Sequence, residues 1–291
     1  MERLKTPIFK FLSKVNTMEN NLLKEIPPIE VRKISLPFSD IDNKYFYNNN
    51  AIISTLLAYM SASFPGGEKG FIDSVRYYES AIDDPDLKNR VKSFIGQEGH
   101  HSHQHRRVNK ALANIGLAAD KVEESHAKRV TKDRQQWNPK NFLAYTVGME
   151  HFTAIIAEYA LKNPEVFEPL SPSVRNLLLW HAVEEIEHKS VAFEVYETCV
   201  GGKTRLNVMM AYGTILNLVR IGAGQFEILK ETKEIPKFSD IGETMTLLFG
   251  KKGLITGITK PYLDFFKAGF HPWENGLIDS YDDWKQKLDV Y

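Results

Sequence analysis

The sequence predicts an all-α protein, built on a four-helix bundle with extra helices at its C-terminal end. Gly and Pro cluster at a few points instead of recurring roughly every ten residues, as they do in chains of short strands. No β-branched strand segments alternate with helical ones, and no glycine-rich phosphate loop or short repeat is present. The 291 residues, 43% of them hydrophobic, are enough to bury a sizeable core.

The boundaries of the predicted helices follow from Pro and Gly. Pro85, Pro139 and Pro172 each open a helix, because proline fits the first helical turn. The highly charged residues 120–136 predict a solvated connector or a surface helix. In chain order we expect helices over 44–81 (interrupted at Pro65-Gly66-Gly67), 85–115, 139–163, 172–201, 204–230, 239–249, 254–268 and 276–289.

These helices suggest three regions: an N-terminal tail over 1–35, a metal-binding bundle over 36–203, and a helical extension over 204–291 that packs on the bundle. Apolar residues at 8–12 beside lysines leave a membrane-surface helix open in the tail, although a frayed solvated segment is favoured. The apolar stretch 206–219 is too short for a membrane span. We expect it to be a buried or homodimer-forming helix, with lipid contact as the alternative.

Charge and cysteine content narrow the partners and the compartment. Lys plus Arg equals Asp plus Glu, at 37 each, so the basic excess typical of nucleic-acid binding is missing and we expect no nucleic-acid partner. Cys199 is the single cysteine, which rules out an internal disulfide. The N-terminus lacks the uninterrupted apolar core of a secretory signal. We therefore expect a cytoplasmic protein.

Two Glu-x-x-His pairs carry the main functional signal. Glu98 stands three residues before His101, and Glu185 stands three residues before His188. Residues at i and i+3 share one face of a helix, so each pair offers a carboxylate and an imidazole in the same direction. Two such pairs, with one lone Glu from each of two further helices, make the ligand set of ferritin-like carboxylate bundles with two metal ions.

Helix geometry indicates which lone carboxylates complete this set. Antiparallel neighbours bring together residues that are equally far from the turn joining them. Counting back from the turn near Asp84 by the distance that separates it from Glu98 reaches Glu68. Glu150 and Glu185 lie at matching distances on either side of the turn at 163–172. Four carboxylates would offset the charge of two divalent cations, and with imidazoles they suit iron, or alternatively manganese.

Other residues near the pairs have weaker assignments. His181 is four residues before Glu185 on the same stripe, which predicts a third imidazole ligand, although a helix-surface position is also open. His105 is on the face of His101 and is a candidate hydrogen-bonding partner of a ligand. Glu184 could replace Glu185 or orient His188. We expect four further histidines to lie off the metal face, with the first at the surface: His126, His100, His103 and His151.

The same motifs support a family resemblance. Five parts of the sequence carry this resemblance: Phe64-Pro-Gly-Gly-Glu68, Gln97-Glu98-x-x-His101-x-x-x-His105, Glu150, Trp180-His181-x-x-Glu184-Glu185-x-Glu187-His188-Lys189, and Gly269-Phe270-His271-Pro272-Trp273. Together they resemble the bacterial family labelled predicted metal-dependent hydrolases, over roughly 35–285. The ligand pattern alone also resembles the di-iron arylamine N-oxygenases. That resemblance implies seven metal ligands: Glu68, Glu98, His101, Glu150, His181, Glu185 and His188.

The sequence leaves three functions open. The first is a di-iron oxidase or oxygenase that uses O2 on a small organic substrate and takes electrons from an unknown donor. The second is a dinuclear metal-dependent hydrolase, and the third is a non-catalytic metal-binding bundle. For the first function, the candidate walls of a substrate cavity are Phe71, Phe94, Tyr145, Met149, Phe152 and Thr153, and core packing would explain these residues equally well. Phe270–Trp273 could cap the site, but an anchoring role in the core is favoured.

Overall fold

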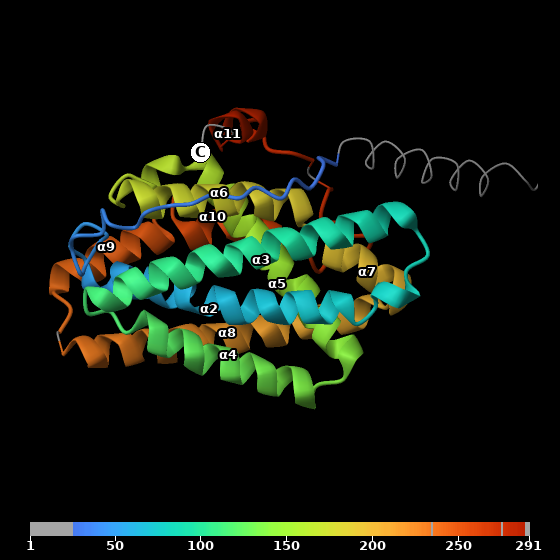
Figure 1. Cartoon of the computed structure of the whole chain (residues 1–291), viewed down its shortest axis with the longest axis horizontal. Coiled ribbons are helices and arrows are strands. Elements are labelled where there is room, and N and C mark those ends of the chain that lie inside the picture. Colours follow the sequence, from blue (N-terminus) through green and yellow to red (C-terminus); the bar gives the residue numbers. More distant parts are fainter. Residues whose placement is uncertain (1–25, 234, 275, 289–291) are drawn as a thin grey trace, which may run out of the picture.

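The computed structural model describes residues 26–233, 235–274 and 276–288, and every regular element within them is a helix. Figure 1 shows an elongated bundle built on α2 (Ala51–Arg76), α3 (Pro85–Asn114), α5 (Pro139–Lys162) and α6 (Pro172–His188). The helices α4 (Ala119–Gln136) and α8 (Lys203–Thr232) run along its side. The predicted all-α bundle with extra C-terminal helices is therefore confirmed. The apolar residues at 8–12 lie outside the described part of the chain.

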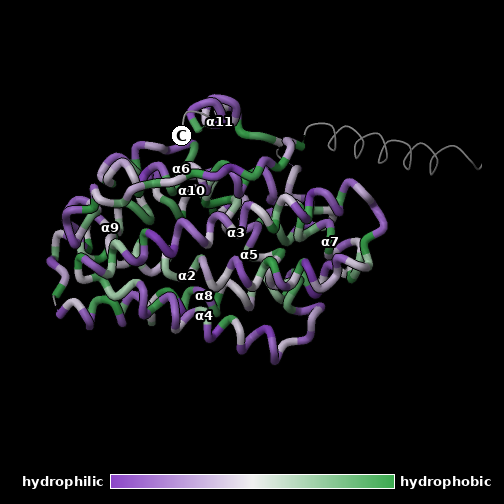
Figure 2. The backbone as a smooth tube through the Cα atoms, in the orientation of Figure 1, coloured by the Kyte–Doolittle hydropathy of each residue, from purple (hydrophilic) through white to green (hydrophobic). Residues whose placement is uncertain are grey.

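Local sequence explains where the bundle helices begin. Asn50 caps α2 by accepting a hydrogen bond from the amide of Ile53. Asp84 and Asn138 cap α3 and α5 in the same way, each followed by a proline in the first turn. These caps satisfy amides that have no partner inside the helix, and proline loses nothing there because the first amides are unpaired. The charged segment after α3 forms the helix α4, which Figure 2 shows largely in hydrophilic colours.

The interruption expected at Pro65-Gly66-Gly67 is wrong, since α2 continues through it. Proline removes an amide that would have bonded the carbonyl of Ser61, four residues earlier. The side-chain amide of Asn109 on α3 donates to that carbonyl instead, at 3.3 Å, so no buried acceptor is left unpaired. Gly66 lets α4 pack closely, because a Cβ there would lie 2.9 Å from the Cα of Ala127. A neighbouring helix thus stabilises a segment that would break in isolation.

The single helix expected over 172–201 is also wrong, because it divides into α6 and α7 (Val191–Cys199). The break falls at Lys189 and Ser190, both buried. The indole of Trp273 donates to the Ser190 hydroxyl at 2.9 Å, and the Lys189 ammonium lies 4.0 Å from the centre of that indole ring. Trp273 is 1% exposed, and Phe270 is buried against Phe265. This segment anchors the chain at the break and does not cap the cluster described below.

The extension after α7 covers one side of the bundle. The helix α8 packs against α2 and α5, and it is followed by α9 (Phe238–Phe249) and α10 (Leu254–Asp264). The helix α11 (Tyr281–Leu288) lies against α6. Residues 26–38 run along the bundle without helix or turn and contribute Ile34 and Leu36 to its core, and turns at 39–40 and 46–49 lead into α2. Of the described helices, α8 is the one that is long and apolar enough to cross a membrane.

Candidate metal centre

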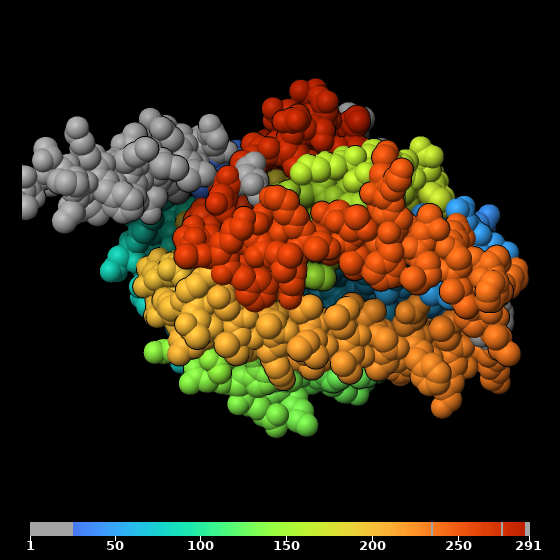
Figure 3. All heavy atoms as spheres, turned by 180° about the vertical axis from the view of Figure 1, so that it is seen from behind, coloured from blue at the N-terminus to red at the C-terminus, as the bar shows by residue number. Residues whose placement is uncertain are grey.

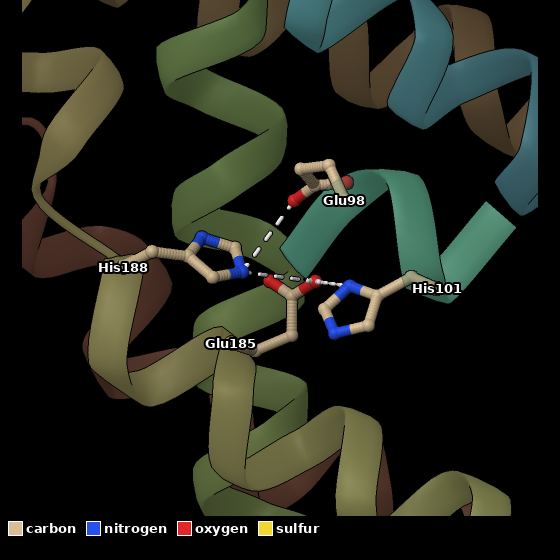
Figure 4. Close-up of side chains that lie close together, drawn as sticks. All are labelled: Glu98, His101, Glu185 and His188. Atoms are coloured by element: carbon tan, nitrogen blue, oxygen red, sulfur yellow. Dashed lines mark ion pairs between the residues drawn. The ribbon is translucent and has the colours of Figure 1, made fainter. Parts of the chain in front are cut away.

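The centre lies in the middle of the bundle, where α6 is buried on all sides. Every residue from Leu179 to Ser190 is buried, including three glutamates and two histidines. Apolar side chains close the cluster at both ends, since Trp180 packs edge-on against His101 and Phe94 packs edge-on against His188. Figure 4 shows Glu98 and His101 on α3 facing Glu185 and His188 on α6. The two predicted Glu-x-x-His pairs therefore meet across the bundle.

The first group of potential ligands consists of these four residues. Nε2 of His188 lies 3.4 Å from Oε1 of Glu98 and 3.9 Å from Oε1 of Glu185. Nδ1 of His101 lies 4.0 Å from the same Glu185 oxygen. One ligand atom from each residue lies within 4.8 Å of all the others, which is close enough to surround one metal ion.

The second group consists of Glu68, His105 and His181. Nε2 of His181 lies 2.8 Å from Oε1 of Glu185 and 3.9 Å from Oε1 of Glu68. The hydroxyl of Ser102 donates to the other Glu68 oxygen at 2.7 Å. Since Oε1 of Glu185 faces both groups, this carboxylate stands where a bridging ligand between two metal ions would stand.

Glu150 on α5 joins the first group through His188. Its Oε2 lies 3.1 Å from Nδ1 of His188, while its Oε1 has no hydrogen-bond partner among the described residues. The structure thus brings together all seven residues predicted as ligands, from the four helices that the counting argument selected. A carboxylate at Nδ1 leaves Nε2 of His188 as the nitrogen that faces the cluster.

His105 is placed to hold His181 in one orientation. Its Nδ1 lies 2.9 Å from the hydroxyl of Ser61, which in turn donates to Asn109 at 2.6 Å. Its Nε2 lies 2.9 Å from Nδ1 of His181. Because the one hydroxyl proton of Ser61 goes to Asn109, Nδ1 of His105 donates to Ser61. A neutral His105 then accepts at Nε2 from Nδ1 of His181, which leaves the lone pair on Nε2 of His181 free to face Glu68 and Glu185.

Glu184 acts on a different histidine from the one expected. Its Oε2 lies 3.0 Å from Nε2 of His101, so it orients His101 and not His188. Its Oε1 accepts from the indole of Trp180 and from the backbone amide of Arg32. A carboxylate on one ring nitrogen leaves the other, Nδ1 of His101, directed at the cluster.

Unpartnered buried atoms show that the cluster fits a cation. Among the described residues, both oxygens of Glu98, one oxygen each of Glu68 and Glu150, Nδ1 of His101 and Nε2 of His188 are buried without a hydrogen-bond partner. Buried polar atoms are rarely left unpaired, because each costs about 1–3 kcal/mol. All of these atoms can donate a lone pair, so metal ions would satisfy them together.

The pKa shifts of four ligands agree with this assignment, whereas the carboxylates of Glu185 and Glu150 outweigh burial at His188 and raise its pKa to about 9. Burial raises the pKa of Glu68 and Glu98 well above the usual value, and nearby carboxylates add to the effect for both. Burial also raises the pKa of Glu150 to about 7. Burial lowers the pKa of His101 well below its usual value, with neighbouring histidines adding to the shift. Such carboxylates are costly to ionise without a cation, and a neutral imidazole is the form that binds metal.

A second polar network behind the centre was missed by the sequence analysis. The guanidinium of Arg32 donates to Glu187 at 2.7 Å and also contacts Glu184. Gln97 donates to Glu187 at 2.7 Å, and so does the hydroxyl of Tyr281. Arg32 comes from the segment expected to be a tail. The available signal was the pair Glu184 and Glu187, which must meet a counter-charge if α6 is buried on every side.

An apolar cavity of ≈ 280 Å³ ends at the second group. Glu68, His105, His181 and Glu185 form part of its wall. Phe64 covers the two histidines, with ring centroids 4.6 and 4.8 Å away. Of the six candidate cavity residues, Phe94 is not in the wall and packs on His188, whereas the other five line the cavity: Phe71, Tyr145, Met149, Phe152 and Thr153.

The remaining histidines fall outside the cluster. His151 turns away from it and bonds the carbonyl of Pro261 at 3.1 Å. His103 is exposed and His100 is half-buried. The surface position expected for His126 is wrong, because this residue of α4 is 5% exposed and its ring packs edge-on against Tyr59 of α2. The sequence around His126 is highly charged, and the close approach of α4 to Gly66 that buries it is not visible in a charge pattern.

The similarity of the chain to known proteins identifies its family. No curated protein and no solved structure matches the chain significantly. One protein family matches residues 30–276, a range that includes all seven predicted ligands and both hydrogen-bonding partners. The chain belongs to this family, which is described as predicted metal-dependent hydrolases.

Proposed function

We propose that this chain is a metal-dependent enzyme that holds two metal ions and acts on an elongated, largely apolar small molecule. One observation carries the proposal: the apolar cavity ends on the same side chains that form the second ligand group. A pocket lined by apolar groups, with a few polar groups converging at one end, is the usual form of a small-molecule site. A purely structural metal site has no need of such a pocket.

The proposed ligands are the seven residues named from the sequence, with Glu185 between the two metal positions. Carboxylates and imidazoles suit iron first and manganese second. Bound iron would supply the redox chemistry that couples the reduction of O2 to the oxidation of an organic substrate. The site's own chemistry favours this reaction class, an oxidase or oxygenase, since its ligands stand on rigid helices beside an apolar pocket. The electron donor would be a separate molecule.

The chain's own residues have three tasks in this proposal. Thr153 donates to Oε2 of Glu185 at 2.6 Å and so holds the shared carboxylate from the pocket side. His105 and Glu184 orient the rings of His181 and His101. Phe64 and the apolar wall exclude water from the end of the pocket, which strengthens every electrostatic interaction there. The substrate would be held by shape and apolar contact.

Hydrolysis is the second candidate, and the family description favours it. Two metal ions can activate a water molecule and polarise an ester, and the same cavity could then hold an apolar acyl group. The two candidates share the metal centre and the pocket, and they differ in whether the reaction needs O2 and an electron donor.

The test is to grow the full-length chain with iron or manganese and to measure the metal content of the purified protein. Two metal ions per chain are expected. The iron form is then followed optically as O2 is admitted, and long-chain alcohols, amines and chromogenic acyl esters are offered in parallel. An optical change with O2 uptake supports oxidation, and ester cleavage without O2 supports hydrolysis. A chain that binds no metal under either growth condition would overturn the proposal.

Matched variants locate the metal. A double variant, Glu98→Ala with His188→Ala, should lose metal, because it removes two of the four residues in the first group. His126→Ala is the control, since that histidine is also buried but lies outside both groups. Retention of both metals by the double variant would contradict the site. Loss of metal from a folded His126→Ala chain would contradict the claim that the metal site is confined to the two groups.

A further inference from the structure

The side of the molecule formed by α8 and α9 exposes an unusual amount of apolar surface. Ile215 and Phe226 on α8 are 65% and 68% exposed, and Phe238 on α9 is 90% exposed. We call these residues and their neighbours the apolar face. Its members are Val208, Tyr212, Ile215, Leu218, Val219 and Phe226 on α8, with Phe238, Ile241, Met245 and Phe249 on α9.

The exposure is a property of how α8 is built. Its inner side is already used, since Met210 is fully buried and a Cβ at Gly213 would lie 3.0 Å from the ring of Tyr145. Its outer side carries apolar residues spaced by three and four from Val208 to Phe226, which is one helix face. Arg220 is the charged residue of this stretch, and its guanidinium donates to Oδ2 of Asp133 at 2.7 Å, away from the outer face. Both sides of the helix are therefore apolar, and only one is covered.

The face adjoins the substrate pocket. Figure 3 shows a hollow between α8 and the α9–α10 arm, with helices of the bundle visible at its floor. The cavity wall includes Asn217 and Ile221 from α8, Leu247 from α9 and Leu254 from α10. The pocket that ends at Glu68 and His181 thus extends to the helices that carry the apolar face. A molecule passing through this hollow would meet apolar groups from the surface to the ligand cluster.

Charge on the same segment is positive. Over residues 203–268, Lys and Arg outnumber Asp and Glu by ten to six, while the whole chain has a formal net charge of +0. Lys251 and Lys252 follow Phe249 after one glycine, and Lys252, which pairs with Glu165 at 3.1 Å, remains 79% exposed. Apolar side chains bordered by lysines are the surface that binds an anionic lipid bilayer. A second copy of the chain would bring the same excess of positive charge to the face.

We propose that the apolar face docks on an anionic lipid bilayer and that apolar molecules enter the pocket from the membrane. Docking as a surface fits better than spanning, because the inner side of α8 is committed to the bundle. The exposed apolar side chains enter the lipid interface, and the lysines contact the headgroups. The docking step stands on the face alone, whereas the delivery of substrate rests on the proposed function.

The test is co-sedimentation of the full-length chain with lipid vesicles, which needs neither metal nor turnover. Binding is expected to vesicles of phosphatidylglycerol mixed equally with phosphatidylcholine, and to be much weaker with phosphatidylcholine alone. Ile215→Ser with Phe238→Ser should weaken binding by about tenfold per side chain. Lys251→Gln with Lys252→Gln should weaken it by about fivefold per lysine. The matched controls are Tyr77→Ser, directly after α2 and 65% exposed, and Lys110→Gln on α3, because both lie off the face.

Each outcome has a definite meaning. Loss of binding in both face variants, with the controls unchanged, supports docking. No binding by the unaltered chain, or equal binding by face variants and controls, overturns it. A dimer in light scattering that the Ile215→Ser, Phe238→Ser chain dissociates, without vesicle binding by the parent, assigns the face to a second copy and also overturns it. Vesicle binding by a chain that takes up no metal when grown with iron or with manganese would support docking while refuting the proposed function.

Discussion

Glu150→Gln should make the metal-free protein more stable, although it removes a residue from the centre of the fold. Burial raises the pKa of Glu150 from 4.5 to about 7, even with His188 opposing the shift. A carboxylate with a raised folded-state pKa costs stability as the pH rises through 4.5 to 7, and the full cost is present above about 7. That difference corresponds to about 3 kcal/mol at pH 8. Glutamine has nearly the same shape and cannot ionise.

The assay is thermal unfolding of the chelator-treated protein at pH 8 and pH 4. We expect the melting temperature of the variant to rise by about 5 °C at pH 8 and to change little at pH 4. With metal the sign reverses, because a neutral amide is a poor ligand and the stabilisation by bound metal falls. The control is Glu197→Gln at an exposed residue on α7, which should change neither the melting temperature of the metal-free protein at pH 8 nor the stabilisation by metal. A metal-free variant that is less stable at pH 8, or one that metal stabilises as much as the parent, would refute the assignment of Glu150.

Three further predictions concern the surroundings of the centre. Glu184→Leu should weaken metal binding by about 10–100-fold, measured by competition with a chelator, because His101 loses the partner that orients its ring. His126→Phe should make the protein more resistant to unfolding by acid. Burial lowers the pKa of His126 to about 3, so the parent loses up to about 4–5 kcal/mol of stability as the pH falls from 6.5 to 3, and phenylalanine cannot take up that proton. Gly67→Leu should keep the fold and raise the KM for any pocket substrate, because Gly67 lines the cavity and a Cβ there meets nothing within 4 Å. Gly66→Leu should instead unfold the chain by displacing α4.

The ligand cluster could be predicted because its signal is local and repeated. The spacing of Glu98 from His101 and of Glu185 from His188 depends only on helix geometry, which holds wherever the helix packs. The matching depth of Glu68 and Glu150 needs one further assumption, that neighbouring helices are antiparallel and joined by short turns. Both conditions are met here, so a count along the chain was enough to find residues that lie together in space.

The errors share a different origin, because each depends on a contact between distant segments. Pro65 was expected to interrupt a helix, and a side chain on α3 replaces the missing bond. His126 was expected at the surface, and a glycine on α2 brings it inside. The break at Lys189 coincides with the indole of Trp273, more than eighty residues later. Propensity describes a segment in isolation, and tertiary packing overrides it at these three positions.

The strongest argument for metal comes from comparing the carboxylates on the two sides of α6. Glu187, on the outer side, is paired with Arg32 at 2.7 Å, so its burial is compensated by protein. Glu185, on the inner side, has histidines as its charged partners, and no Lys or Arg of the described residues pairs with the four predicted carboxylate ligands. The same helix therefore neutralises one buried carboxylate with an arginine and leaves the inner set of four carboxylates without a lysine or arginine. Since uncompensated buried charge costs several kcal/mol per ion, the inner set requires protons or metal. The unpaired Nδ1 of His101 points to metal, because Glu184 holds the other ring nitrogen and burial lowers the pKa of this imidazole, which keeps a lone pair directed at the cluster.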